Sequence, residues 1–157
     1  MKKLKFSVVG LGRIGKIHLE KLLKIKNIEV VAVMDPIEEA RNYARDIGIP
    51  FIFSSYKEMF SITNFDVLVI FSTTDTHANY VELAAKEGKH IFCEKPLELS
   101  LERVNEVLDT VKINGVSLML GFNRRFDKEF RKVRQLVKNG EIGEPHIVKI
   151  TSRDPGA

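Results

Sequence analysis

The sequence predicts an α/β protein: a doubly wound parallel sheet, followed by a truncated second domain of the α+β type. Short apolar runs alternate with helical patterns over most of the chain, a glycine-rich segment follows the first run, and the pattern changes after Gly121. Alternating strands and helices are joined by right-handed crossovers, which place helices on both faces of a parallel sheet. We expect one domain over residues 1–122, then a connecting helix and the first strand of the truncated domain over residues 123–157.

Six apolar runs are expected to form the strands of the sheet. They are short, apolar or β-branched, and most are bounded by turn residues. The fourth is continuously apolar, as expected for a parallel strand that is covered on both faces. In chain order they are Leu4–Val9, Ile28–Met34, Phe51–Phe53, Val67–Phe71, Ile91–Cys93 and Val116–Leu120.

Helical patterns separate these runs. Further helices are expected over about Ile37–Ile47, over Tyr56–Phe60, and from a cap at Thr74 or Asp75 to Gly88. Ser100 is expected to cap one more helix, which lies between the Ile91–Cys93 and Val116–Leu120 strands. The apolar positions of the first helix are Ile14, Ile17, Leu22 and Ile25. The helix capped by Ser100 is expected to bury one stripe of apolar residues: Leu101, Val104, Leu108 and Val111.

After Gly121 we expect a helix over about Phe126–Lys138 and then one strand over about His146–Thr151. No later strand is available to pair with it, and an unpaired strand leaves its backbone groups open. The isolated chain is therefore expected to dimerise through this strand or to leave it disordered.

Composition and charge limit the classes of protein. The net charge of the 157 residues is +4, and no apolar run is long enough to cross a bilayer. Cys93 is the only cysteine, so no internal disulfide forms and a reducing, cytoplasmic compartment fits. We expect no metal site. The basic residues gather near the end of the chain. Because this cluster lacks interleaved stacking aromatics and a known docking motif, it is interpreted as a solvated helix face and not as a nucleic-acid site: Arg124, Arg125, Lys128, Arg131, Lys132, Arg134 and Lys138.

The segment Gly10–Gly15 matches the G-x-G-x-x-G fingerprint of Rossmann-type dinucleotide-binding domains. It follows a strand, opens a helix and precedes an acidic residue about twenty positions further on. The glycines allow a tight turn, close approach to a diphosphate and close helix packing, and the helix N-terminus favours an anion. A glycine-rich turn that binds nothing is the alternative. The expected contacts are Gly10, Gly12, Arg13, Ile14 and Gly15.

Asp35 ends the second strand and favours NAD over NADP as the cofactor. Its carboxylate accepts hydrogen bonds from ribose hydroxyls and repels a 2′-phosphate. Asp35 and Glu38 also match a capping box for the next helix, with Pro36 at the first helical position. The two roles are compatible.

Glu94, Lys95 and Pro96 follow the fifth strand, at the carboxyl edge where ligands of open α/β sheets bind. A lysine beside a nicotinamide can stabilise the alkoxide that develops as a hydride leaves carbon. The alternative is a surface ion pair between Glu94 and Lys95.

In combination these motifs resemble the Gfo/Idh/MocA oxidoreductases, and the later motifs resemble the inositol 2-dehydrogenase branch of that family. The resemblance covers the whole chain. It is carried by Gly10–Gly15, Asp35, Ser72–His77, Glu94–Pro96, Gly121–Asp127, Gly140–Gly143 and Ile150–Pro155.

The resemblance implies an enzyme that oxidises a secondary alcohol of a cyclic polyol or sugar to a ketone and passes a hydride to NAD. It implies that Lys95 is the catalytic lysine and that Glu94 lies near the nicotinamide ribose. The other residues implied to line the cofactor site are Ser72, Thr73, Thr74 and His77, with Asn123 and Arg125 near the nicotinamide and substrate.

Members of the family are roughly twice as long, and their second half carries an aspartate and a histidine that serve in proton transfer. Two hypotheses therefore stay open: part of a dehydrogenase, or a stand-alone NAD-binding module that is inactive without a missing domain. The expected partners are a small polyol or sugar and either a second copy of the chain or a complementing C-terminal chain. Neither nucleic acid nor membrane is expected as a partner.

Overall fold

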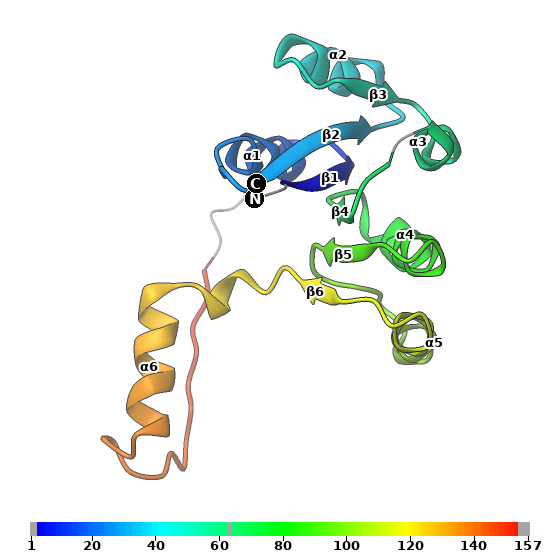
Figure 1. The fold of residues 1–157 in the computed structure, drawn as a ribbon. Coiled ribbons are helices and arrows are strands. Elements are labelled where there is room, and N and C mark those ends of the chain that lie inside the picture. Colours follow the sequence, from blue (N-terminus) through cyan, green and yellow to red (C-terminus); the bar gives the residue numbers. More distant parts are fainter. Residues whose placement is uncertain (1–2, 63, 154–157) are drawn as a thin grey trace. The chain divides into compact units, whose positions relative to one another are not determined.

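Six parallel strands form one sheet in the computed structural model, which describes residues 3–62 and 64–153 (Figure 1). The strand order is β3-β2-β1-β4-β5-β6, and every neighbouring pair is parallel. This order, with β1 beside β4 at the point where the winding reverses, is the Rossmann order. The predicted fold class is confirmed. The strands are β1 (Leu4–Val9), β2 (Ile28–Met34), β3 (Phe51–Phe53), β4 (Val67–Ile70), β5 (His90–Cys93) and β6 (Leu118–Leu120).

Helices cover both faces of the sheet because alternate strand residues point to opposite sides. Val8 and Val69 pack with residues of α1 and α2, whereas Val9 and Ile70 pack with residues of α3, α4 and α5. Figure 1 shows α1 on one side of the strands and α3, α4 and α5 on the other. The helices are α1 (Arg13–Leu22), α2 (Glu38–Asp46), α3 (Tyr56–Ile62), α4 (Thr74–Lys86) and α5 (Leu101–Ile113).

The helix predicted from the spacing of Ile14, Ile17, Leu22 and Ile25 is formed, but most of these residues do not lie on its inner side. Ile14 and Ile17 are exposed, whereas Gly15 and Leu19 are buried and Leu22 is half-buried. The third glycine of the fingerprint packs against the turn after β1, and this contact fixes which side of the helix faces the sheet. Residues four and seven positions further on share that side.

The predicted stripe of α5 is wrong at two of its four positions. Leu101 is 76% exposed and Leu108 is 45% exposed. Val107 and Val111 are buried, and Val104 packs against the same core. Valines at successive turns thus form the inner face, and the larger leucines lie outside it. The predicted cap is confirmed, because the Ser100 hydroxyl accepts a hydrogen bond from the Arg103 amide.

The chain forms two compact units, Met1–Gly121 and Phe122–Ala157, and each is described by itself. The second contains a 3-10 turn, η1 (Asn123–Arg125), and helix α6 (Lys128–Lys138). The helix begins two residues after the predicted start because the Asp127 carboxylate accepts hydrogen bonds from the Glu129 and Phe130 amides.

The strand predicted over His146–Thr151 is not formed in the described structure. A strand exists only where a neighbouring chain segment accepts and donates its backbone hydrogen bonds, and the described part of the second unit offers none. The last two residues of the Ile150–Pro155 motif lie outside the described residues. No helix in residues 3–62 and 64–153 is long and apolar enough to cross a membrane.

The single cysteine lies at the end of β5, fully buried, and its Sγ donates to the Glu94 carbonyl oxygen at 3.3 Å. Burial, with a smaller effect of the Glu94 carboxylate, raises the pKa of the Cys93 thiol to about 12. A buried neutral thiol is inert, because the thiolate is the nucleophile.

We expect Cys93 in the folded chain to react with a thiol-specific disulfide reagent at about pH 8 roughly a thousandfold more slowly than in the urea-unfolded chain. The factor follows from the difference between this pKa and the ordinary value of 9.0. The absorbance of the thiol that the reagent releases measures the reaction rate in both states. Equal rates in the folded and unfolded chains would contradict the burial of Cys93.

Candidate cofactor and active site

The glycine loop joins β1 to α1 at the carboxyl edge of the sheet. The Gly10 amide donates to the Met34 carbonyl oxygen at 2.9 Å, and Gly10 has a φ of +90°, which favours glycine. A Cβ at Gly10 would lie 2.5 Å from the Ser72 amide nitrogen, and a Cβ at Gly15 would collide with the Gly10 carbonyl oxygen. Both glycines are therefore required by close packing.

The second glycine differs from these two because it faces open space. Gly12 is the N-cap of α1, no side chain caps this helix end, and a Cβ added to Gly12 would meet no atom within 4 Å. The amides of Arg13, Ile14 and Gly15 are the first of the helix and have no acceptor within it. The loop thus presents amide donors and a helix N-terminus to an uncovered space, which fits a diphosphate.

Asp35 follows β2 at the same edge and is only 5% exposed. Its Oδ2 accepts a hydrogen bond from the Leu11 amide at 2.6 Å, and its Oδ1 accepts one from the Ile37 amide at 2.8 Å. The predicted capping box is wrong: the N-cap of α2 is Ile37, without a side-chain bond. Glu38 pairs with Arg41 and Arg45 instead of reaching back to the helix end.

The segment Ser72–His77 leads from β4 into α4, whose N-cap is Thr73. The predicted cap at Thr74 or Asp75 is thus one or two residues late. The hydroxyl oxygens of Ser72 and Thr76 lie 2.6 Å apart, and the Thr76 hydroxyl donates to the Thr73 carbonyl oxygen at 2.7 Å. These bonds hold the turn at the carboxyl end of β4.

His77 is 2% exposed, so its alternative interpretation as a surface imidazole is wrong. Its Nδ1 lies 2.7 Å from the Pro96 carbonyl oxygen and its Nε2 lies 2.9 Å from the Ser72 carbonyl oxygen. The ring therefore joins the turn after β4 to the turn after β5, which carries Lys95. His77 acts on this edge by positioning main chain, and its predicted contact with the cofactor stays a prediction.

Glu94 and Lys95 follow β5 and do not form the ion pair considered as the alternative. The Glu94 carboxylate, 16% exposed, lies 3.2 Å from His18 Nε2 and accepts a hydrogen bond from the Lys95 amide at 3.1 Å. Lys95 is exposed, and its peptide bond to Pro96 is cis. Within residues 3–62 and 64–153 no side chain holds the Lys95 ammonium, which is available to a ligand.

His18 is a site residue that the sequence interpretation missed. Its ring stacks on Phe71, with the ring centroids 4.5 Å apart, and its Nε2 faces Glu94. The spacing from Gly15 was the available signal, because a residue one turn after the packed glycine lies on the inner side of α1. On the other side of Glu94, a Cβ at Gly121 would lie 2.8 Å from its Oε1.

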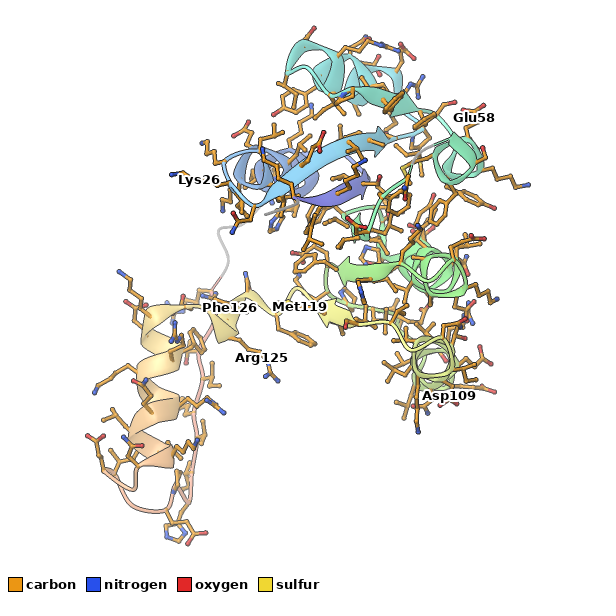
Figure 2. The ribbon with its side chains drawn as sticks, viewed as in Figure 1. Lys26, Glu58, Asp109, Met119, Arg125 and Phe126 are labelled. Carbon is orange, nitrogen blue, oxygen red and sulfur yellow. The ribbon has the colours of Figure 1, made fainter. Side chains whose placement is uncertain are left out.

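Asn123 and Arg125 lie in the second unit and are exposed. Arg125 and Phe126 project from the segment just before α6 (Figure 2). The Arg125 guanidinium carbon lies 5.9 Å from the Phe122 ring centroid. The structure shows no contact of Asn123 or Arg125 with a cofactor group, and their roles stay predictions.

The basic cluster of the second unit contains exposed aromatic side chains, contrary to the sequence interpretation. Phe126 and Phe130 are exposed between the arginines, and Arg124 lies over the Phe130 ring at 5.0 Å. They line one hollow with Arg124, Arg125, Arg131, Arg134 and Gln135. Among the described residues, no group of three metal-ligating side chains is arranged to hold a metal ion.

The carboxyl ends of β1, β2, β4 and β5 thus bring together a loop of free amides, a buried carboxylate, a hydroxyl-rich turn and an exposed lysine. This arrangement is that of a dinucleotide-binding domain of the Rossmann class. The sequence pattern of the GFO_IDH_MocA group, described as "Oxidoreductase family, NAD-binding Rossmann fold", matches residues 4–122. The chain belongs to the Gfo/Idh/MocA oxidoreductase family.

Relatives within the family support the predicted resemblance to inositol dehydrogenases. The chain is 41% identical over 155 residues to the uncharacterized oxidoreductase YrbE of Bacillus subtilis, covering 98% of this chain and 46% of that protein. It is 41% identical over 153 residues to myo-inositol 2-dehydrogenase of Thermotoga maritima, covering 97% of this chain and 46% of that protein. The chain spans about half the length of these curated relatives.

A solved structure agrees with the fold. The scyllo-inositol dehydrogenase from Lactobacillus casei with bound NAD(H) and scyllo-inositol superposes with a TM-score of 0.86 at 32% identity. The match covers 90% of this chain and 43% of that one.

We expect His77→Ala to lower the free energy of unfolding by about 3 kcal/mol, because it removes the imidazole that lies between the Ser72 and Pro96 carbonyl oxygens and opens a cavity. Urea unfolding followed by circular dichroism measures the change. His146→Ala is the matched control, since His146 is exposed, and we expect it to stay within about 0.5 kcal/mol of wild type. Equal effects of the two substitutions would show that the imidazole does not join the two turns.

Proposed function

We propose that this chain is the NAD-binding part of an oxidoreductase that oxidises a secondary alcohol of a cyclic polyol or sugar, of the myo-inositol type, to a ketone. The observation that carries the proposal is the juxtaposition at one sheet edge of the open glycine loop, the buried Asp35 and the exposed Lys95. Ligands of open α/β sheets bind at this edge, where the strand order reverses.

The glycine loop and Asp35 are proposed to hold the dinucleotide. Amides at Gly12, Arg13 and Ile14 donate to the diphosphate, while Gly10 and Gly15 keep the loop close to the sheet. Each Asp35 oxygen accepts one main-chain amide and retains a lone pair for a ribose hydroxyl. The residues proposed beside the cofactor on the neighbouring turns are Ser72, Thr73, Thr74, His77 and Glu94.

Lys95 is the proposed catalytic residue. NAD supplies the hydride acceptor of the reaction when it is bound. The Lys95 ammonium donates a hydrogen bond to the substrate hydroxyl oxygen and stabilises the negative charge that grows there. An ammonium has no lone pair, so a second group must take the proton, and the family resemblance implies an aspartate and a histidine after position 157 for this task.

The second candidate function is a stand-alone NAD-binding module, or one half of a split dehydrogenase that needs a complementing C-terminal chain. The chain spans 46% of the length of the first curated relatives. We propose a boundary between residues 122 and 123, with Asn123 and Arg125 serving the nicotinamide and substrate. We also propose that the protein forms a homo-oligomer and is located in the cytoplasm.

We expect Gly12→Ala to weaken NAD binding at least tenfold while the free energy of unfolding changes by less than about 1 kcal/mol. The added methyl group meets no protein atom but enters the space proposed for the diphosphate. Isothermal calorimetry with NAD measures the affinity, and urea unfolding measures the stability. If wild type binds neither NAD nor NADP, or if Gly12→Ala binds NAD as wild type does, the proposed site is wrong.

We expect Lys95→Met to leave the NAD dissociation constant within about twofold and to lower the rate of nicotinamide reduction with myo-inositol at least a hundredfold. The absorbance of the reduced nicotinamide measures this rate. Lys89→Met is the control with the same change of charge, since the Lys89 ammonium lies over the Phe65 ring. A Lys95→Met variant as fast as wild type would remove Lys95 from the chemistry, and NAD binding without turnover in wild type would favour the binding module.

A further inference from the structure

An arginine lies at the edge where the adenosine ribose is proposed to bind. Arg41 belongs to α2, and its side chain is 14% exposed. Its Nη1 donates to the carbonyl oxygens of Asp35 and Pro36, both at 2.8 Å. The guanidinium is therefore held against the main chain that follows β2.

The position of Arg41 is relevant to whether the chain prefers NAD or NADP. A carboxylate at the end of the second strand binds the ribose hydroxyls of NAD, whereas an arginine nearby accommodates the 2′-phosphate of NADP. The chain presents both groups, at Asp35 and Arg41. Asp35 is also buried and bonded to two amides, so part of its charge is already neutralised by main-chain dipoles.

Glu38 is the side chain that pairs with Arg41 at this edge. The Arg41 Nη2 donates to Glu38 Oε2, and Arg45 Nη1 donates to the other oxygen, Oε1, at 2.9 Å. Hydrogen bonds from Arg45 and Arg41 hold the pKa of the Glu38 carboxyl below its usual range, so it is ionised at neutral pH. The Glu38 side chain is 55% exposed.

We propose that Glu38 is a specificity-determining residue for the adenosine end of the cofactor: it pairs with the second guanidinium nitrogen of Arg41, and this keeps Arg41 from holding a 2′-phosphate. The inference rests on the proposed function, because it assumes that a dinucleotide binds at this edge. Preference for NAD then depends on two carboxylates, Asp35 and Glu38, of which the second acts through the arginine that it pairs with.

Glu38→Gln tests the proposal, because it keeps the size of the side chain and removes its charge. Calorimetric titration of the 157-residue chain with NAD and with NADP gives both dissociation constants. We expect the constant for NADP to fall about tenfold and the constant for NAD to change less than twofold. The gain for NADP is expected to shrink with added salt, as for a charge-assisted contact with a phosphate.

Two variants separate the local effect from its alternatives. Glu39→Gln makes the same change of charge one residue further along α2, at an exposed position, and is expected to leave the ratio of the two constants unchanged. Glu38→Gln combined with Arg41→Gln is expected to lose the gain for NADP, with urea unfolding confirming that the double variant is folded.

The outcomes distinguish this inference from the proposed function. If wild type binds neither dinucleotide, the proposed function fails. If wild type binds NAD and Glu38→Gln keeps the wild-type ratio, the inference on Glu38 is overturned while the proposed function stands. An equal gain in Glu39→Gln, or a gain that survives the loss of Arg41, also overturns it.

Discussion

The hydrogen bond from the Leu11 amide to the buried Asp35 carboxylate connects the parts of this molecule on which a dinucleotide site depends. It spans 24 positions of the sequence and ties the glycine loop after β1 to the tip of β2. A charge-assisted bond to a side chain that water barely reaches is stronger than the same bond at the surface. Because the other Asp35 oxygen binds the Ile37 amide, the same side chain also sets how the chain enters α2. The places of Glu38 and Arg41 follow from that turn.

His77 plays the corresponding part between β4 and β5. Like Asp35, it is buried, and its two ring nitrogens lie within hydrogen-bond distance of main-chain oxygens in the turns after β4 and β5. Buried polar side chains bonded to main chain position loops without adding a reactive group to the surface. The exposed Lys95 thus lies in a turn whose main chain is held by the buried His77. A reactive side chain needs such a rigid support to keep its position.

The charged side chains around this edge are largely paired within the protein. His18 faces Glu94, and Arg41 and Arg45 share Glu38. Among the described residues, the amides at the start of α1 and the Lys95 ammonium have no side-chain partner at this edge. In the proposed function the loop amides hold a diphosphate through main-chain dipoles, which need no long side chain to be immobilised, and the free Lys95 ammonium stabilises the charge that develops on the substrate.

The sheet, its strands and the nucleotide-binding loop could all be predicted from the order of residues, because short apolar runs, glycine spacing and the acidic residue after β2 are local patterns. The side of a helix that packs inward could not. Apolar residues occur all around α1 and α5, and only contact with the sheet selects Leu19 over Ile17, or Val107 over Leu108. The hydrogen-bond partners of polar side chains could not be predicted from the sequence either. The Asp35 carboxylate accepts a bond from the distant Leu11 amide instead of capping α2, and Glu94 faces His18 instead of Lys95. Local pattern determines which elements form, whereas long-range packing decides which atoms meet, because a side chain's hydrogen-bond partner depends on where separate elements are brought together in space.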